Sequence, residues 1–323
     1  MRKNFYFILV AIFAATFMTS CGADENGAIE EVLSKKTYAK VISTYDHVND
    51  FFSEGTCIVK SNGKYGVINM KGKEIIPCTH ERIYDCSDGM FLFYTKDEDY
   101  NYWYGFLDKT GKVAIEPQYK DAEGFSDGLA LVKKDAKDSW VDDHAFINKK
   151  GEIVVDFKTY TRMKSFSDGL AAVNIDNDDK DVWGYINTKG EVVIAPTYDY
   201  TYPFSDGVAI VGKNDKEFLI DKKGEVAFIP GKDMEFLEET FSEGLMPVAK
   251  GNSLKAKCGF INTKGEEVLP FEYDYAEGFI DGEAYVIKDF KFLVIDKKGE
   301  VLEEEILDVD DIEEYLDDIL DIF

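Results

Sequence analysis

Acidic side chains gather in three loops of the sequence, over residues 97–103, 135–143 and 176–181, and the first two loops also carry Tyr or Trp. Aromatic rings stack on apolar or sugar surfaces, and carboxylates pair with cations or accept hydrogen bonds. The pattern therefore predicts a site for a basic or carbohydrate-like ligand, with solvated hairpin tips of an acidic protein as the alternative. The candidate contact residues are Tyr100, Tyr102, Trp103, Trp140, Asp142, Asp178 and Asp181.

Residues arranged for catalysis are not apparent. The three histidines, His47, His80 and His144, are scattered and follow no metal-ligand spacing. The sequence has no nucleophile elbow, P-loop or dinucleotide fingerprint. Adjacent carboxylates carry no information in a chain with 63 Asp and Glu residues. We therefore expect no enzyme activity and no cofactor.

The acidic run Asp176–Asp181 has the alternating oxygen ligands that calcium prefers. A calcium loop also needs a glycine at its sixth position and a glutamate at its twelfth, and this run has neither. We therefore predict no metal site.

The overall charge is strongly negative, because 63 Asp and Glu oppose 37 Lys and Arg to give −26. Nucleic-acid binders use Lys and Arg to displace counterions from phosphates, so this balance argues against DNA or RNA partners. Hydrophobic residues make up 45% of the chain, which is enough for a folded core.

The N-terminus has the features of an export signal. Two basic residues precede an uncharged apolar run over residues 5–17, which is too short to span a hydrocarbon core of about 30 Å. Residues 18–21, Met-Thr-Ser-Cys, resemble the bacterial lipoprotein signal, although Met18 stands where Leu is usual. The resemblance implies removal of residues 1–20 and lipidation of Cys21. An ordinary secretory signal is the alternative.

Lipidation implies attachment to a membrane through acyl chains only, each buried methylene contributing about 0.8 kcal/mol. We expect a lipid anchor in the bacterial outer membrane. Asp24 and Glu25 resemble acidic surface-export signals, so both the periplasmic side and the cell surface stay open. Residues 21–37 are expected to form a linker.

The remaining cysteines follow no spacing of a disulfide framework or metal motif. Three of them occupy apolar positions of the repeats described next, so we expect small buried side chains. The sequence leaves their redox state open. These residues are Cys57, Cys78, Cys86 and Cys258.

Two short patterns alternate along the chain and define seven units of about 38 residues. One is Phe-Ser-Asp/Glu-Gly and the other is Asp/Asn-x-x-Gly. Units of this size bury their apolar faces only against their neighbours. The glycines of the first pattern are 55, 89, 128, 169, 207, 244 and 282, and those of the second are 72, 111, 151, 190, 224, 265 and 299.

Each unit consists of β-prone runs joined by turn residues. In the fourth unit the runs are 170–173, 183–186 and 192–194, and residues 187–190 form a turn. A proline is expected to end the last strand, because it lacks a backbone donor. These prolines are Pro77, Pro117, Pro196 and Pro270.

The repeated Phe predicts one row of side chains that forms a hydrophobic spine, with a ligand-stacking ladder as the alternative. The Ser and Asp that follow it are expected to form turns. A nucleophilic serine would need a base in every unit, and the sequence has none.

Residues 183–187, Trp-Gly-Tyr-Ile-Asn, have near copies at 104–108 and 258–262. On these motifs the units resemble the WG-repeat (KWG) family of bacterial proteins over about residues 40–302. The resemblance implies a β-rich interaction module without catalytic residues. Three units depart from the motif because they lack its glycine, so a different geometry is expected there; Ala145, Phe218 and Leu293 replace it.

We predict an all-β fold in which residues 38–302 form seven tandem WG-type repeats. Each unit has room for four strands of about five residues, and seven sheets can form a propeller-like ring. An open β-solenoid is the alternative. An extra leading strand at Val41-Ile42 favours it slightly, since the seventh unit has its own return strand at Val301-Leu302.

Residues 303–323 hold eleven acidic residues and no basic one. Apolar residues that step by three and four predict a short amphipathic helix there. Acidic groups near its end oppose the helix dipole, so the helix should dock as a cap on the array. A partner-binding tail is the alternative. The apolar residues are Val309, Ile312, Leu316, Ile319 and Phe323.

These features predict a non-catalytic binding module at the cell envelope. The three lengthened loops lie in successive units, and insertions in repeat arrays concentrate on the binding face. The expected partner is an envelope or surface protein, or a glycan. A structural envelope protein and, less favoured, an enzyme acting on an envelope polymer are the alternatives.

Overall fold

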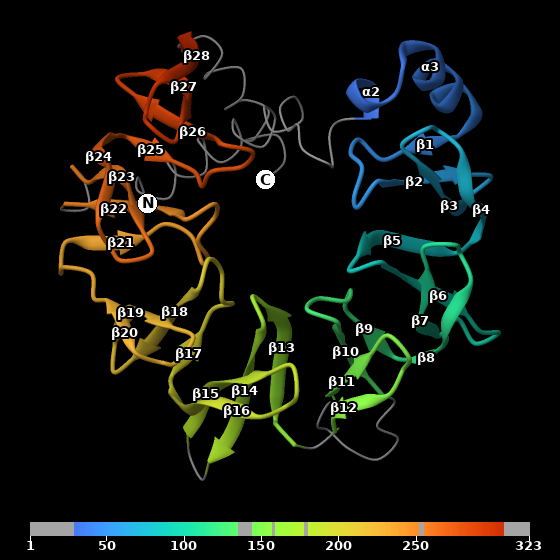
Figure 1. The fold of residues 1–323 in the computed structure, drawn as a ribbon, viewed down its shortest axis with the longest axis horizontal. Helices are drawn as coiled ribbons and strands as arrows, with labels where there is room; N and C mark the ends of the chain where they lie inside the picture. Colours follow the sequence, from blue (N-terminus) through green and yellow to red (C-terminus); the bar gives the residue numbers. More distant parts are fainter. Residues whose placement is uncertain (1–28, 135–143, 157–158, 178–179, 252–254, 307–323) are drawn as a thin grey trace.

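The computed structural model describes residues 29–134, 144–156, 159–177, 180–251 and 255–306. In this part of the chain, seven separate antiparallel sheets each contain four strands. Figure 1 shows them arranged side by side around a common centre, in chain order. The prediction of an all-β, propeller-like array of seven units is confirmed.

The strands of each sheet follow one another in the sequence, so each sheet is one repeat unit. The first sheet contains β1 (His47–Val48), β2 (Thr56–Ser61), β3 (Lys64–Asn69) and β4 (Glu74–His80); the second contains β5 (Arg82–Ser87), β6 (Met90–Lys96), β7 (Tyr102–Asp108) and β8 (Val113–Tyr119); the third contains β9 (Asp121–Ala122), β10 (Leu129–Lys133), β11 (His144–Asn148) and β12 (Ile153–Val155); the fourth contains β13 (Arg162–Ser167), β14 (Leu170–Asn177), β15 (Lys180–Asn187) and β16 (Val192–Tyr198).

The other three sheets repeat this order. The fifth contains β17 (Tyr200–Thr201), β18 (Val208–Lys213), β19 (Lys216–Asp221) and β20 (Val226–Phe228); the sixth contains β21 (Met234–Phe236), β22 (Leu245–Lys250), β23 (Lys257–Asn262) and β24 (Glu267–Tyr273); the seventh contains β25 (Tyr275–Ala276), β26 (Glu283–Lys288), β27 (Lys291–Asp296) and β28 (Val301–Ile306).

The glycine of the WG motif lets the third and fourth strands of a sheet come close together. A Cβ atom on Gly184 would lie 2.4 Å from the carbonyl oxygen of Ile194, well inside van der Waals contact. The pairing of β15 with β16 shifts register at this point, which marks a β-bulge. Only glycine allows this approach of the two backbones.

The prolines lie within the fourth strands and do not end them. Pro196 lies in β16, which continues to Tyr198, because the bulge interrupts the ladder where the proline lacks its N–H. The same holds for Pro77 in β4, Pro117 in β8 and Pro270 in β24, so the prediction that these residues terminate strands is wrong.

The three units without this glycine build the fourth strand differently. Where Ala145 and Phe218 replace it, β12 and β20 have three residues each. Where Leu293 replaces it, β28 stays paired with β27 without a bulge at that residue, and Leu293 lies opposite Glu304. A side chain at this position prevents the close approach of the fourth strand to the third. The fourth strand is therefore either short, as in β12 and β20, or paired without a bulge at this residue, as in β28.

Apolar side chains fill the space between successive sheets. Phe204 of the Phe-Ser-Asp-Gly pattern is fully buried and packs on Tyr185 of the preceding sheet, with ring centroids 4.7 Å apart. Phe125 packs on Phe106 in the same way, at 4.8 Å. The repeated rings thus form core layers between sheets, and each contacts the preceding sheet instead of joining a single row of Phe. Burial of one such ring contributes about 1.5–3 kcal/mol.

Two helices cover the first sheet. They are α2 (Ile29–Val32) and α3 (Lys35–Thr44), which begins at an N-cap where the Ser34 hydroxyl accepts the N–H of Thr37 at 3.4 Å. Val41 is buried against the sheet, with Ile29 and Leu33 in the same cluster. Residues 29–32 and 35–37 of the predicted linker are therefore helical, whereas its residues 21–28 lie outside the described chain. The prediction of a strand at 41–42 is wrong.

The ring is not closed by strand pairing. Within the described chain, β28 pairs with β27, and no ladder joins the seventh sheet to the first. Strand β28 extends to Ile306, so residues 303–306 are not helical as predicted, because they stay paired with β27. Residues 307–323, which carry the rest of the predicted helix, lie outside the described residues.

The described part of the chain has no helix with the length and apolar content that a membrane crossing requires.

Candidate binding surface

The Ser and Asp of the repeated pattern connect each sheet to the next. The Ser205 hydroxyl donates to the Phe241 carbonyl at 2.6 Å, and the N–H of Gly244 donates to the Asp206 carboxylate at 2.7 Å. Equivalent bonds recur from the first sheet to the seventh. These residues form turns, as predicted, and they also link neighbouring sheets, so their role is structural.

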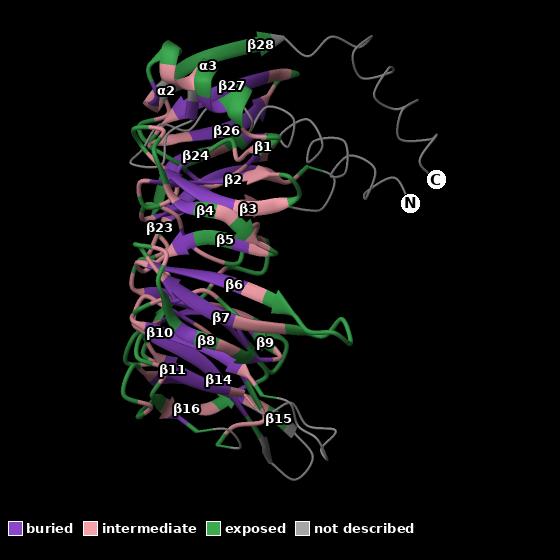
Figure 2. Ribbon diagram, turned by 90° about the vertical axis from the view of Figure 1, so that its right-hand side faces the viewer, coloured by how far each residue is buried: buried purple, intermediate pink, exposed green. Residues whose placement is uncertain are grey.

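The hairpins between second and third strands project from the molecule. Figure 2 shows the exposed end of the β6–β7 hairpin extending from one side of the molecule, and strands β14 and β15 run towards the same side. The loop between β10 and β11, residues 135–143, is outside the described chain. Of the three lengthened loops of the sequence, the one over residues 97–103 is therefore described in full, and the loop over residues 176–181 is described only in part.

Asp97 holds the tip of the β6–β7 hairpin in a fixed conformation. Its carboxylate accepts the N–H groups of Asp99 at 3.0 Å and Asn101 at 2.9 Å. The indole N–H of Trp103 donates to the same carboxylate at 2.9 Å. The hydrogen bond from Trp103, followed by those from Asn101, lowers the pKa of Asp97 to about 2.

Tyr100 stands at this tip in a left-handed backbone conformation with φ of 65°. Such a conformation is costly for a residue other than glycine and is retained where surrounding contacts impose it. The side chain is 74% exposed, and the Lys96 ammonium lies 4.7 Å from its ring centroid. The tip therefore presents an aromatic ring to solvent on a preorganised backbone.

Tyrosines from three strands of the second sheet gather below this tip. Tyr94 lies at their centre, with ring centroids 4.9 Å from Tyr102, 5.6 Å from Tyr104 and 6.5 Å from Tyr84. The contacts with Tyr102 and Tyr104 are edge-to-face, the arrangement that aromatic quadrupoles favour. We call Tyr84, Tyr94, Tyr100, Tyr102 and Tyr104 the tyrosine patch.

A basic side chain connects this patch to the first sheet. Arg82 lies opposite Tyr94 in the ladder, and its guanidinium lies 5.3 Å from the ring of Tyr84. It also stacks on Tyr65 at 4.6 Å and donates to the Tyr65 hydroxyl at 2.7 Å. Cation–π contacts of this kind hold the rings in place.

Burial and neighbouring hydroxyls raise the pKa values of two tyrosines of the patch, Tyr94 and Tyr104. Burial raises the pKa of Tyr104 to about 12, and the nearby Tyr84 hydroxyl adds to the shift. Burial also raises the pKa of Tyr94, with Tyr84 and Tyr102 as further causes. These two side chains therefore offer uncharged rings and hydroxyl groups at physiological pH, which suits stacking and hydrogen bonding.

The structure separates the predicted contact residues into different groups. Tyr100 and Tyr102 are exposed and lie together, as expected for a binding loop. Trp103 is half-buried; it bonds Asp97 and lies under the Lys120 ammonium at 3.9 Å, so it supports the tip. Trp140, Asp142 and Asp178 lie outside the described residues, as does the predicted lipidation site Cys21.

Asp181 belongs to a different hairpin from the tyrosine patch. It forms an ion pair with Arg162, whose guanidinium lies 5.3 Å from the ring of Trp183. In the ladder of β14 and β15, Asp176 lies opposite Asp181. The described residues contain no group of three or more His, Cys, Asp or Glu side chains that could hold a metal ion.

The four cysteines of the repeats are free thiols. Cys57, Cys86 and Cys258 are buried, and burial raises their pKa values to about 12, 12 and 11. Cys78 is half-buried, and burial also raises its pKa. The expectation of small buried side chains is confirmed for the first three.

The sequence patterns did not point to Arg82, Tyr84, Tyr94 and Tyr104. These residues lie on β5, β6 and β7 and meet only through cross-strand pairing, in which Tyr94 lies opposite both Arg82 and Tyr104. One signal was available, since the second unit combines tyrosines on all three of these strands, at positions 84, 94, 102 and 104.

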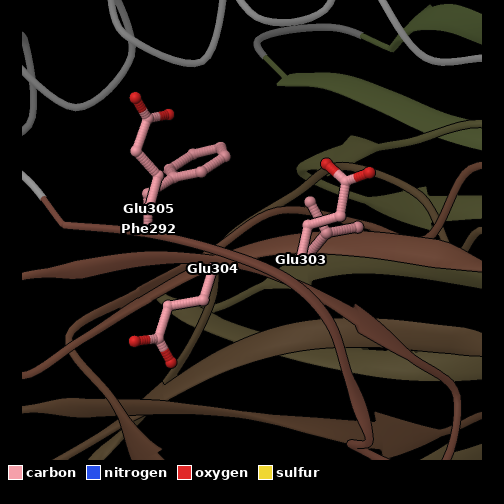
Figure 3. Close-up of a pocket in the computed structure, with 5 residues that line it drawn as sticks. Phe292, Glu303, Glu304 and Glu305 are labelled. Carbon is pink, nitrogen blue, oxygen red and sulfur yellow. The ribbon is translucent and has the colours of Figure 1, made fainter.

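A small pocket of about 220 Å³ lies elsewhere, on the seventh sheet. Figure 3 shows Glu303 and Glu305 on one side of β28 with Phe292, while Glu304 points to the other side. Val294 completes the lining. This surface lies on the last sheet of the array, away from the tyrosine patch on the second.

Comparisons with known proteins identify the repeat. A profile of the family described as "WG containing repeat" matches six segments. No curated protein matches this chain. The segments are residues 40–65, 65–98, 104–137, 145–177, 183–216 and 259–289.

Solved structures that resemble this chain include propellers at low sequence identity. The β-propeller domain of the Trilobed protease from Pyrococcus furiosus is 13% identical, with a TM-score of 0.43, over 82% of this chain and 98% of that one. Hsv2p of Kluyveromyces lactis is 10% identical, with a TM-score of 0.41, over 82% and 100%. The acylaminoacyl peptidase of Pyrococcus horikoshii is 14% identical, with a TM-score of 0.41, over 82% and 53%.

The matched segments cover more than half of the residues, and so the chain belongs to the WG-repeat family.

Proposed function

We propose that this protein is a non-catalytic binding module of the bacterial cell envelope. The observation that carries the proposal is the tyrosine patch, which ends in an exposed Tyr100 on a tip held by Asp97. Rigid aromatic side chains contribute large contact areas at little entropic cost, which makes them frequent anchors of binding surfaces.

The charge of the chain supports a cationic or hydroxyl-rich partner. Residues 97–99 of the tip are all acidic, and the whole chain carries −26. An electrostatic field of this sign attracts basic segments and repels phosphate polymers. The proposed partner is an envelope or surface protein, or a glycan.

The N-terminal sequence supports export and anchoring. We propose that Cys21 carries the lipid and that residues 1–20 are removed. Replacement Cys21→Ser should move the protein from the membrane fraction to the soluble fraction and abolish metabolic labelling with a fatty acid. Protease treatment of intact cells then distinguishes the surface from the periplasmic side.

Cross-linking in intact cells, with identification of the captured molecule, tests the binding function. The double variant Tyr100→Ala/Tyr102→Ala should capture at least tenfold less partner than the wild type, because both exposed rings are removed while the core is unchanged. Phe290→Ala is the matched control, since it removes an exposed ring from the tip of another hairpin, in the seventh sheet. Equal capture by the double variant and the wild type would contradict the proposal.

A further inference from the structure

The apolar layers of the array differ at its two ends. Six layers are shared by neighbouring sheets, and a seventh lies between α2–α3 and the first sheet. An eighth cluster is made only of residues of the seventh sheet. We call the surface of Tyr285, Ile287, Phe292 and Val294 the terminal face.

The terminal face is apolar and is covered in the folded chain. Ile287 is 9% exposed and Val294 3%, values typical of core residues. Tyr285 and Phe292 stack on each other with ring centroids 5.4 Å apart, and they are buried as well. The buried residues of α2 and α3 belong to the cluster at the other end, on the first sheet. Because these exposures are those of the single chain, the cover of the terminal face comes from another part of the same chain.

We propose that residues 307–323 form this cover and dock on the terminal face as a helix. The segment follows β28 directly, and β28 is the outer strand of the same sheet. Seventeen helical residues measure about 25 Å, close to the 20 Å of a six-residue strand. The apolar residues of the segment, spaced by three and four, form one stripe of the required length.

The two ends of the array would then be closed in the same way. Open repeat arrays need a capping element at each end, because the terminal units expose an apolar face that internal units share. Helices α2 and α3 meet this need on the first sheet. The C-terminal segment meets it on the seventh.

Electrostatics opposes this docking and gives it a distinctive signature. Glu303 and Glu305 border the terminal face, and the segment itself has eight acidic residues and no basic one. Added salt screens the repulsion between these carboxylates, while the apolar contact persists. The association should therefore become tighter as the salt concentration rises, unlike contacts held by ion pairs.

The test uses the chain truncated after Ile306 and a synthetic peptide of residues 307–323. We expect truncation to speed amide hydrogen exchange in β27 at least tenfold and to lower the melting temperature. The peptide should restore protection saturably and bind more tightly at 0.5 M than at 0.05 M salt. The matched control is a peptide of the same composition in which the apolar spacing is scrambled, and it should bind at least tenfold more weakly.

Three outcomes would overturn the proposal. Equal binding of both peptides would show that the terminal face does not recognise the apolar stripe of residues 307–323. Unchanged exchange in β27 after truncation would show that another segment covers it. A full-length chain that is dimeric, with β27 protected only in the dimer, would assign the terminal face to a second copy. The full-length variant Leu316→Asp, compared with Asp317→Ala, repeats the test without removing chain, and only the former should speed exchange.

Discussion

The carboxylate of Asp168, in the turn of the fourth sheet, accepts the backbone N–H of Gly207 in the matching turn of the fifth sheet at 2.7 Å. Asp168 also forms an ion pair with Lys222, which follows β19. Bonds of this kind recur between successive sheets, so the array is held by polar links at its turns as well as by its apolar layers.

The contribution of this link can be measured at Asp168. Replacement by Ala removes the acceptor of Gly207 and places Ala at φ of 55°, so we expect a loss of about 1–2 kcal/mol in the free energy of unfolding. Asp168→Asn keeps an acceptor and tolerates the left-handed conformation, so it should lose less than about 1 kcal/mol, the value of the exposed ion pair. Chemical denaturation measures both. Equal losses in the free energy of unfolding of the two variants would show that the charge of Asp168, and not its hydrogen bond to Gly207, stabilises the array.

The close approach at Gly184 predicts a larger effect. Gly184→Ala places a Cβ atom against the backbone of β16 at Ile194, and we expect a loss of about 2–3 kcal/mol with the bulge displaced. Ala145→Gly, at the same position of the third unit, is the control. The Ala145→Gly variant should lose only about 0.5–1 kcal/mol in the free energy of unfolding, because the short strand β12 does not approach the backbone at residue 145. A neutral Gly184→Ala variant would show that the backbone approach is not required.

The tip of β6–β7 should respond to acid through Asp97. The folded-state pKa of about 2 lies below the ordinary aspartate pKa of 3.8, so the hydrogen bonds stabilise the tip above about pH 4 and are lost as the pH falls towards 2. The chemical shift of the Trp103 indole N–H, followed by NMR, should titrate with a midpoint near 2. Asp97→Asn removes this titration. A midpoint near 4 in the wild type would contradict the fixed tip.

Phe290 occupies a turn that suits glycine. Its φ is 62°, that of Asp289 is 50°, and its ring is 73% exposed. Phe290→Gly should raise the free energy of unfolding by about 1 kcal/mol, because glycine adopts this conformation without strain. Phe290→Ala keeps the strained backbone and should give no gain. Destabilisation by the glycine variant would reveal a packing role for the ring.

The free thiols should differ in reactivity. The thiolate is the reactive form, and burial raises the pKa values of Cys57, Cys86 and Cys258 to about 12, 12 and 11. In a form that starts at residue 22, a thiol reagent at pH 8 should modify Cys78 first and the other three only on unfolding. Mass spectrometry of the labelled protein identifies the sites. Labelling of all four in the native state would show that the sheets open readily.

The site was only partly predictable from the sequence. Tyr100 and Tyr102 are neighbours in one loop, so their composition alone marked them. Tyr84 and Tyr94 lie on β5 and β6 and join them through the sheet, which brings together residues of separate strands. The strand predicted at residues 41–42 is part of helix α3, in which Val41 is the buried residue. A helix with so few apolar residues shows no clear helical spacing, and its short apolar run resembles that of a strand.

By itself, the sequence determined the number of units, the all-β class and the positions of the turns, since glycines with positive φ and alternating apolar residues act locally. Only the tertiary structure decided how the units are linked, where the fourth strands bulge and which tyrosines meet. These features depend on contacts between strands and between sheets. Such contacts join residues that no local rule of spacing brings together.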